Sequence, residues 1–207
     1  MAFDIWLAFV LASFVLVIIP GPTVMLTVSY ALSQGRRIAI ATAAGVALGD
    51  LLAMSASLAG LGALVQTSAT LFTVLKWVGA IYLIYLGIRL LRSPVRPLTP
   101  EAETPPTDAR AVFWHATAVT ALNPKSIGFF IAFVPQFLRP DAPLLPQFAI
   151  LIASFVALGF VNALTYALLA DRMRRQIRRP SVLHWINRIG GGALIALGAF
   201  TVTLKRA

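Results

Sequence analysis

Residues 16–24 read LVIIPGPTV and interrupt a long apolar run with two prolines and a glycine. Proline has no amide hydrogen and clashes with the preceding turn, and glycine adds backbone freedom, so a helix is kinked or broken here. Pro20 and Pro22 leave the carbonyl oxygens of Leu16 and Ile18 without their helical donors. Since the run extends from residue 5 to residue 33, the break falls near its middle.

The run around this break is one of six. Of the 207 residues, 59% are apolar and 12% are charged, whereas soluble domains average roughly 45–50% apolar and about 25% charged. The six runs cover residues 5–33, 39–64, 71–91, 111–138, 145–170 and 183–204. Each exceeds the ~20 residues that a helix needs to cross hydrocarbon, and none alternates as a barrel strand would. The sequence therefore predicts an all-α integral membrane protein with six transmembrane helices and excludes a soluble enzyme.

The basic residues give these spans a direction. The net charge is +10, and twelve of the seventeen lysines and arginines lie in or beside the gaps after the first, third and fifth spans. They are Arg36, Arg37, Arg89, Arg92, Arg96, Arg110, Arg172, Arg174, Arg175, Arg178, Arg179 and Arg188. Arg139, Lys205 and Arg206 lie on the other side. Because loops rich in Lys and Arg stay in the cytoplasm, we predict a multi-pass membrane protein with both termini outside.

The two halves of the chain resemble each other. Residues 79–87 and 190–198 share glycines around an aliphatic centre at an offset of 111, and residues 47–49 match residues 157–159 at an offset of 110. We divide the chain into a first three-helix repeat at 1–91, a proline-rich cytoplasmic linker at 92–110 and a second three-helix repeat at 111–207. Three is an odd number, so the second repeat enters the membrane from the opposite side. Such inverted repeats are a recurring plan of secondary transporters.

The first and fourth spans are predicted to break at matching places, because Asn123-Pro124-Lys125 follows Pro20-Gly21-Pro22 at an offset of 103. The proline of the later motif frees the carbonyl of Thr120 and again lies near the middle of its span. Half-helices then begin at about Thr23 and Lys125, and the amide-bearing start of a helix attracts anions such as a carboxylate. A plain kink without a binding role is the alternative, but two breaks at symmetric depths favour a site.

Two charged residues lie deep in the predicted spans, Asp50 in the second and Lys125 in the fourth. A charge at the bilayer centre costs ~2.5–3.5 kcal/mol on insertion scales, so such residues pair or face water. One interpretation is an ion pair that holds the two spans together. In the other, Asp50 carries the coupling proton while Lys125, beside Asn123, meets the carboxylate of a substrate. A pair that breaks on binding would serve both, and the sequence leaves open whether the two residues contact each other.

Other polar and small residues receive structural interpretations. Lys76 lies near the outer end of the third span and can reach the headgroups, and Asn162 is interpreted as an interhelical hydrogen bond. The glycines at 79, 87, 190, 191, 192 and 198 allow close helix packing, either within the fold or between subunits of a homo-oligomer. The basic stretch 171–180 lies at a membrane face, so we assign it to anionic headgroups and expect no nucleic-acid partner.

The residues needed for metal, cofactor or enzyme chemistry are missing from the sequence pattern. The chain has no cysteine, its two histidines, His115 and His184, lack metal-ligand spacing, and there is no glycine-rich phosphate loop. Asp50 is the single acid at membrane depth, so neither a carboxylate pair nor a nucleophile with a base is indicated there. We expect no cofactor and no metal, and an intramembrane enzyme is the least favoured function.

Several motifs occur in a specific order along most of the chain. They are Pro20-Gly21-Pro22, Gly35-Arg36-Arg37, Gly45 with Gly49-Asp50, Lys76 with Gly79-Ala80, Tyr82-Leu83 with Leu86-Gly87, Asn123-Pro124-Lys125, Phe129-Phe130 and Pro135-Gln136-Phe137. This set resembles the LysE/RhtB-type translocators, the family of lysine exporters and homoserine/threonine efflux proteins. The resemblance implies an inner-membrane exporter of amino acids or close derivatives, driven by the proton-motive force. The family spans basic, neutral and hydroxylated amino acids, and no residue here selects among them.

Together, the residues and the resemblance predict a secondary active transporter that exports amino acids or derivatives such as homoserine, threonine or homoserine lactone by proton antiport. Its partners would be the amino-acid substrate, protons and the lipid bilayer. The predicted pathway residues are Asp50, Asn123, Lys125, Pro20, Gly21, Pro22, Thr23 and Pro124. The alternative is a channel or a non-transporting membrane subunit, which a lack of proton coupling would favour.

Overall fold

The described part of the chain is helical. The computed structural model describes residues 1–19, 21–67, 69–93, 108–139, 142–169 and 180–203. Its elements are α1 (Phe3–Ile18), α2 (Pro22–Thr67), α3 (Ala69–Arg92), α4 (Ala109–Ala121), α5 (Pro124–Ala132), the 3-10 turn η1 (Val134–Phe137), α6 (Leu144–Leu168) and α8 (Pro180–Thr203). No strand occurs among these residues, so the predicted all-α class is confirmed.

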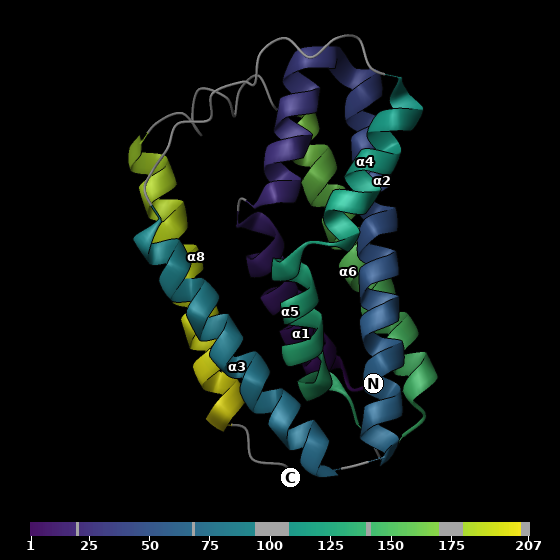
Figure 1. The fold of residues 1–207 in the computed structure, drawn as a ribbon, viewed down its shortest axis with the longest axis vertical. Helices are drawn as coiled ribbons and strands as arrows, with labels where there is room; N and C mark the ends of the chain where they lie inside the picture. Colours follow the sequence, from purple (N-terminus) through teal and green to yellow (C-terminus); the bar gives the residue numbers. More distant parts are fainter. Residues whose placement is uncertain (20, 68, 94–107, 140–141, 170–179, 204–207) are drawn as a thin grey trace.

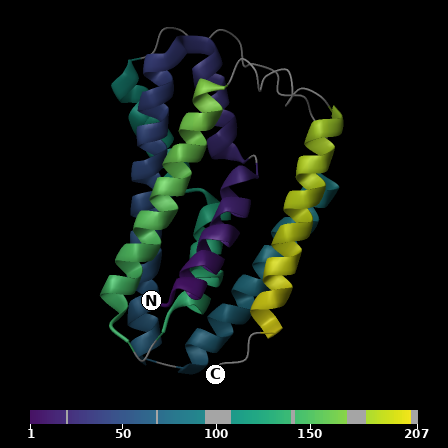
Figure 2. The ribbon, with the colours of Figure 1, turned by 180° about the vertical axis from the view of Figure 1, so that it is seen from behind.

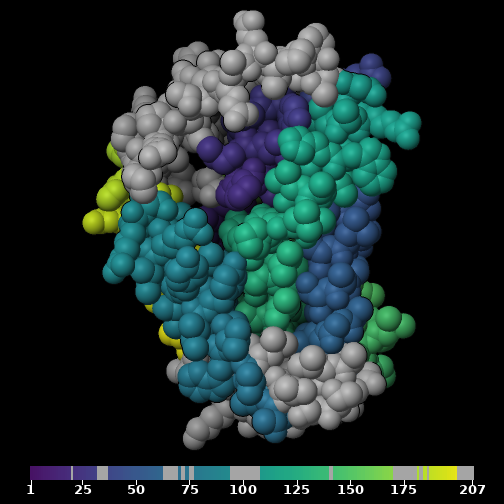
Figure 3. Space-filling view, viewed as in Figure 1, coloured from purple at the N-terminus to yellow at the C-terminus, as the bar shows by residue number. Residues whose placement is uncertain are grey.

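The helices form a bundle in which α5 continues the course of α4 after a bend (Figure 1). α2 folds back on itself: its first limb, Pro22–Ala31, follows α1, and its second limb, Arg37–Gly62, returns along the bundle. The second limb lies beside α4 and α6, while α3 and α8 lie side by side and form the opposite flank, as Figure 2 shows from behind. α1 and α5 lie between these two groups, and the side chains of α5 fill the space between α3 and α2 (Figure 3).

Two of the described helical segments are each long and apolar enough to cross a membrane, namely the second limb of α2 and α6. Two further pairs of helices, each bent at a short break, bring the number of candidate spans to four if each pair counts as one span. α1 and the first limb of α2 are bent by 58°, and α4 and the α5–η1 segment are bent by 45°. Both bends coincide with the breaks predicted at Pro20-Gly21-Pro22 and Asn123-Pro124-Lys125. The arrangement as six spans in two inverted repeats stays a prediction.

Some predicted features lie outside the described residues. They are Pro20, the central part of the linker (94–107), most of the basic stretch (170–179), and Lys205 with Arg206. The side chain of Lys76 also lies outside the described part. The division into repeats at 1–91 and 111–207 is therefore not tested by these elements.

An aromatic core holds the short helix α5. Phe129, Phe130 and Phe133 follow the break at Asn123-Pro124-Lys125 and are buried. The ring of Phe130 meets the ring of Phe155 in α6 edge to face, with centroids 4.7 Å apart. Aromatic side chains bury large areas and prefer such edge contacts, so this packing fixes the helix that begins at the second break.

Glycines allow close approach of the helix backbones. A Cβ atom at Gly45 would collide with the carbonyl oxygen of Phe113 in α4, and one at Gly87 would lie 2.6 Å from the carbonyl oxygen of Gly191 in α8. Gly79, Gly190 and Gly198 are packed in the same way against neighbouring elements. Of the glycines predicted to serve packing, Gly192 differs, because nothing lies within 4 Å of the position that its Cβ would take. The other glycines of this set pack within the fold.

Replacing Gly45 by alanine is expected to destabilise the protein, because the new methyl group meets the backbone of α4. Overpacking of this kind typically costs about 1–3 kcal/mol. The matched control is Gly60→Ala in the same helix, where nothing lies within 4 Å and the loss of glycine flexibility stabilises by about 0.5–1 kcal/mol. Thermal unfolding in detergent should place Gly45→Ala below the wild type and Gly60→Ala at or above it. Equal unfolding temperatures for the two variants would contradict the close contact of α2 with α4.

Candidate functional site

The site is built around the end of α1. The helix stops at Ile18, and Ile19 is extended with ψ 117°, so the last carbonyl oxygens have no donor within the helix. The ammonium group of Lys125, in the first turn of α5, donates to two of them. Its Nζ lies 3.1 Å from the carbonyl oxygen of Leu16 and 2.9 Å from that of Ile19. The positive charge of the side chain thus faces the negative end of the helix dipole.

α6 supplies the donors for the other two carbonyl oxygens. Nδ2 of Asn162 donates to Val17 at 2.9 Å, and the hydroxyl group of Tyr166 donates to Ile18 at 3.0 Å. Each carbonyl oxygen from residue 16 to residue 19 therefore accepts a side-chain hydrogen bond. The expected loss of helical donors at Leu16 and Ile18 is confirmed, and so is the interpretation of Asn162 as an interhelical hydrogen bond.

Asn123 joins the second break to the first. Its Oδ1 accepts from the backbone N–H of Lys125 at 3.0 Å, and Pro124 takes the first helical position, a combination that favours helix initiation. Its Nδ2 donates to Oγ1 of Thr23, in the first turn of α2, at 3.2 Å. The half-helices begin at Pro22 and Pro124, one residue before the predicted positions. The two interruptions are thus in direct side-chain contact.

The carbonyl oxygen of Thr120 finds a new donor close to the break. It was expected to lose its helical donor to the proline at 124, and it accepts instead from the backbone N–H of Asn123 at 3.1 Å. The hydroxyl group of Tyr82 in α3 donates to the carbonyl oxygen of Pro124 at 2.8 Å. The carbonyl oxygens at the second break therefore accept hydrogen bonds from a tightened turn of the chain itself and from a neighbouring helix.

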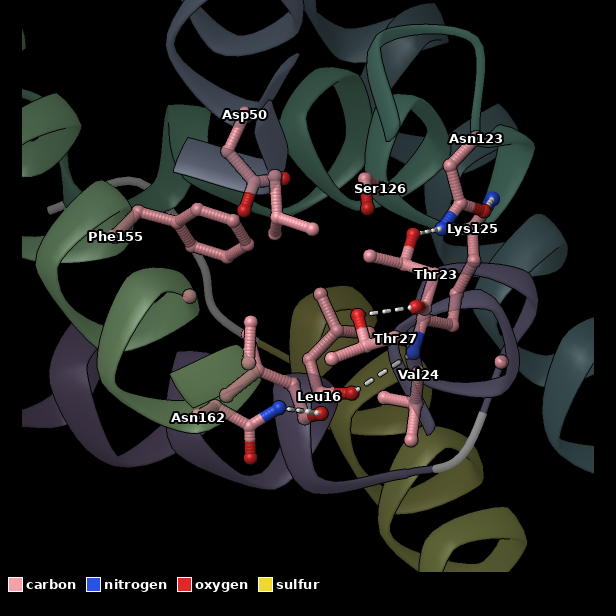
Figure 4. Close-up of a pocket in the computed structure, with 15 residues that line it drawn as sticks. Leu16, Thr23, Val24, Thr27, Asp50, Asn123, Lys125, Ser126, Phe155 and Asn162 are labelled. Atoms are coloured by element: carbon pink, nitrogen blue, oxygen red, sulfur yellow. Dashed lines mark hydrogen bonds between the residues drawn. The ribbon is translucent and has the colours of Figure 1, made fainter. Parts of the chain in front are cut away.

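A pocket of about 440 Å³, counting the part that is open to the outside, lies between the two breaks (Figure 4). Five of the predicted pathway residues line it: Gly21, Thr23, Asp50, Asn123 and Lys125. Pro22 and Pro124 begin the adjoining half-helices but are exposed and do not line it, and Pro20 lies outside the described residues. The structure brings most of the predicted site together.

Asp50 enters the pocket from the second limb of α2 and is only 4% exposed. Its Oδ2 lies against Gly159 of α6, where a Cβ atom would collide with it. Within the described part of the chain, no ion pair joins Asp50 to Lys125, whose ammonium group donates to the end of α1 instead. The pocket thus contains a carboxyl group and an ammonium group that are not paired with each other.

The contribution of α6 was largely missed by the sequence analysis. Phe155, Gly159 and Asn162 line the pocket, and Tyr166 caps α1 from the same helix. These four residues recur every three or four positions and so share one helix face. In an otherwise apolar helix, small and polar residues at this spacing mark the face that packs against other helices, and this signal was present in the sequence.

The fold and the pocket define a class of protein, a helical multi-pass membrane protein with a charged site at two broken helices. The sequence profile of the LysE type translocators matches residues 14–205, and the chain belongs to this family.

Similar proteins cover the whole chain. An "Uncharacterized membrane protein" of Vibrio cholerae is 33% identical over 205 residues, 99% of this chain and 100% of that protein. The proteins of Salmonella typhimurium and Salmonella typhi that are named "Homoserine/homoserine lactone efflux protein" are 34% and 33% identical over 208 residues, which is 100% of each chain. No solved structure matches this chain.

Gly159→Ala is expected to lower the unfolding temperature, because the methyl group would displace the Asp50 carboxylate at an overpacking cost of about 1–3 kcal/mol. In an Asp50→Ala background the same substitution should have little effect, since the carboxylate is gone. The four proteins form a double-mutant cycle that isolates this one contact. Equal destabilisation in both backgrounds, measured by thermal unfolding in detergent, would place the carboxylate away from α6.

Proposed function

We propose that the protein is a secondary active transporter that exports amino acids or close derivatives from the cytoplasm by proton antiport. Homoserine, threonine and homoserine lactone are representative substrates. The observation that carries the proposal is the pocket in which Asp50, Asn123 and Lys125 meet at two broken helices. Membership of a translocator family and the efflux proteins among the relatives support it. No enzymatic step is part of the proposal.

The acyl end of the substrate is proposed to bind near Lys125 and the starts of the two half-helices. Lys125 offers a positive charge, and Asn123 holds the first turn of α5 in place through its bond to the backbone N–H at 3.0 Å. The half-helices begin at Pro22 and Pro124 on either side of the same contact. Helix starts carry a positive dipole end, and broken helices in transporters direct such ends at anionic groups of the substrate.

Asp50 is the proposed carrier of the coupling proton. A buried charge is costly unless another charge compensates it. An ionised Asp50 compensates the amino group of a substrate in the same pocket, whereas a protonated Asp50 is neutral without any substrate. The proton and the amino group of the substrate therefore compete for one carboxylate. This competition is what proton antiport requires.

Six spans in two inverted repeats, at 1–91 and 111–207 and joined by the linker 92–110, are proposed as the framework for this exchange. α3 packs against α8 and the second limb of α2 packs against α6, so the proposed second and third spans lie beside their counterparts in the other half. α3 and α8 have 24 residues each, about 36 Å at 1.5 Å per residue, against a hydrocarbon core of ~30 Å. We propose an inner-membrane location, and from the distribution of arginines we propose that both termini lie outside.

Asp50→Asn is expected to abolish proton-driven transport while leaving the protein folded and inserted, because the amide no longer titrates. The measurement is homoserine flux in proteoliposomes under an imposed pH gradient, which should fall to the rate seen without a gradient. Asp4→Asn, in the first turn of α1, is the matched control and should keep the coupling.

Undiminished coupling in Asp50→Asn would remove this residue from the mechanism. Homoserine flux that ignores the pH gradient in the wild type would favour a channel. An unfolding temperature close to that of the wild type shows that a loss of flux is a loss of coupling and not of fold.

A further inference from the structure

We propose that the carbonyl oxygens of Leu16 and Ile19 form the subsite for the amino group of the substrate, and that Lys125 occupies this subsite when the pocket is empty. The proposal rests on the proposed function, because it names the part of the same pocket that selects the substrate class. That class is compounds with a free primary ammonium group next to an acyl oxygen, as in α-amino acids and their lactones.

The geometry of the Lys125 ammonium group is that of a bound ligand. Nζ makes two hydrogen bonds of 3.1 Å and 2.9 Å to the carbonyl oxygens of Leu16 and Ile19 at the negative end of α1. The α-ammonium group of an amino acid is chemically the same, a primary ammonium with three donors. Carbonyl oxygens at the ends of broken helices coordinate cations in other transporters. An oxygen pair that holds one primary ammonium group is therefore suited to hold another.

Lys125 is able to leave this position when a substrate arrives. Its side chain lines the pocket, and the acyl oxygen of a substrate offers it a new hydrogen-bond acceptor. In an amino acid this acceptor belongs to a carboxylate, whose negative charge the carbonyl oxygens of α1 lack. Gly21 accommodates the ammonium group in its present position, since a Cβ atom there would lie 3.3 Å from Nζ and 3.6 Å from Cε. When Lys125 turns to the acyl oxygen, the two carbonyl oxygens become free beside the amino group of the same molecule. One ammonium group thus replaces another with no loss of hydrogen bonds.

The two neighbouring carbonyl oxygens do not take part in this exchange. Val17 is bonded to Asn162 and Ile18 to Tyr166, and these neutral donors keep the end of α1 capped throughout. Only the carbonyl oxygens of Leu16 and Ile19 are therefore left for the exchange, and they hold a single ammonium group. It also predicts that derivatives with an acylated amino group do not bind, because they present no cation to the subsite.

The test uses a feature of the sequence, its lack of cysteine. Lys125→Cys introduces a unique thiol and a short side chain that leaves the Leu16 and Ile19 carbonyl oxygens without the ammonium group. The probe is propylamine, which has the ammonium group and no acyl oxygen, so it cannot draw Lys125 away in the wild type. Its affinity is measured by the shift of the unfolding temperature of the full-length protein in detergent. We expect Lys125→Cys to bind propylamine at least about tenfold more tightly than the wild type, as befits hydrogen bonds to a charged group.

The ammonium group is then restored chemically on the folded, purified Lys125→Cys protein. Treatment with 2-bromoethylamine replaces bromide by the cysteine sulfur and rebuilds a side chain that ends in an ammonium group, close in length to lysine. This modified protein should return to the low propylamine affinity of the wild type and should recover its affinity for homoserine. Because the modification is made after purification, a failure of folding does not enter the comparison.

Two controls distinguish binding at the subsite from a loosened helix end and from attraction to the nearby acid. Tyr166→Phe removes a donor from the same helix end outside the pocket and should gain no affinity for propylamine. The gain in Lys125→Cys should persist when both proteins also carry Asp50→Asn, because it depends on the carbonyl oxygens and not on an uncompensated acid. A propylamine affinity in Lys125→Cys equal to that of the wild type, or a gain that disappears with Asp50→Asn, would overturn the proposal. Since these measurements record binding alone, they stand or fall separately from proton-coupled export.

Discussion

The carbonyl oxygens at the end of α1 need hydrogen-bond donors, and other helices of the bundle supply them. Four consecutive carbonyl oxygens, from Leu16 to Ile19, lose their helical donors inside the bundle, where unsatisfied polar groups cost several kcal/mol each in hydrocarbon. The chain provides Lys125 from α5 and Asn162 and Tyr166 from α6. The helix break near residue 20 is therefore stabilised by hydrogen bonds from two helices that lie more than a hundred residues later in the chain. The pocket exists because those helices meet at that point.

The donors differ in a way that matters for function. Asn162 and Tyr166 are neutral and hold the helix end in place, whereas Lys125 carries a charge that a substrate can attract. Asp50 faces the same pocket from α2, kept there by the absence of a side chain at Gly159. A carboxylate and an ammonium group that share a pocket without pairing leave both charges for a zwitterionic ligand and a proton. This separation is the physical basis for the proposed antiport.

The sequence predicted the breaks and the charges more readily than their contacts. Pro20 and Pro22 have no amide hydrogen, which by itself predicts the loss of helical donors. Asp50 and Lys125 are recognisable as charges within apolar runs. Which donors satisfy the freed carbonyl oxygens depends on helix packing, so the two hydrogen bonds from Lys125 to the end of α1 were not predicted. Tyr166 was missed because a tyrosine in an apolar helix reveals its partner only when its helix face is known. The number of spans and the repeat symmetry need a membrane reference that helix lengths alone do not supply.

A single thiol in the pocket can report whether the pocket is the substrate site and opens to both sides of the membrane. Ser126 lines the pocket and is 6% exposed, and Ser126→Cys would be the single thiol of the chain. Its rate of reaction with a membrane-impermeant thiol reagent is measured from each face in oriented vesicles, with and without homoserine. We expect reaction from both faces, slowed in each case by homoserine. A rate that homoserine does not change, or reaction from one face under every imposed gradient, would contradict it.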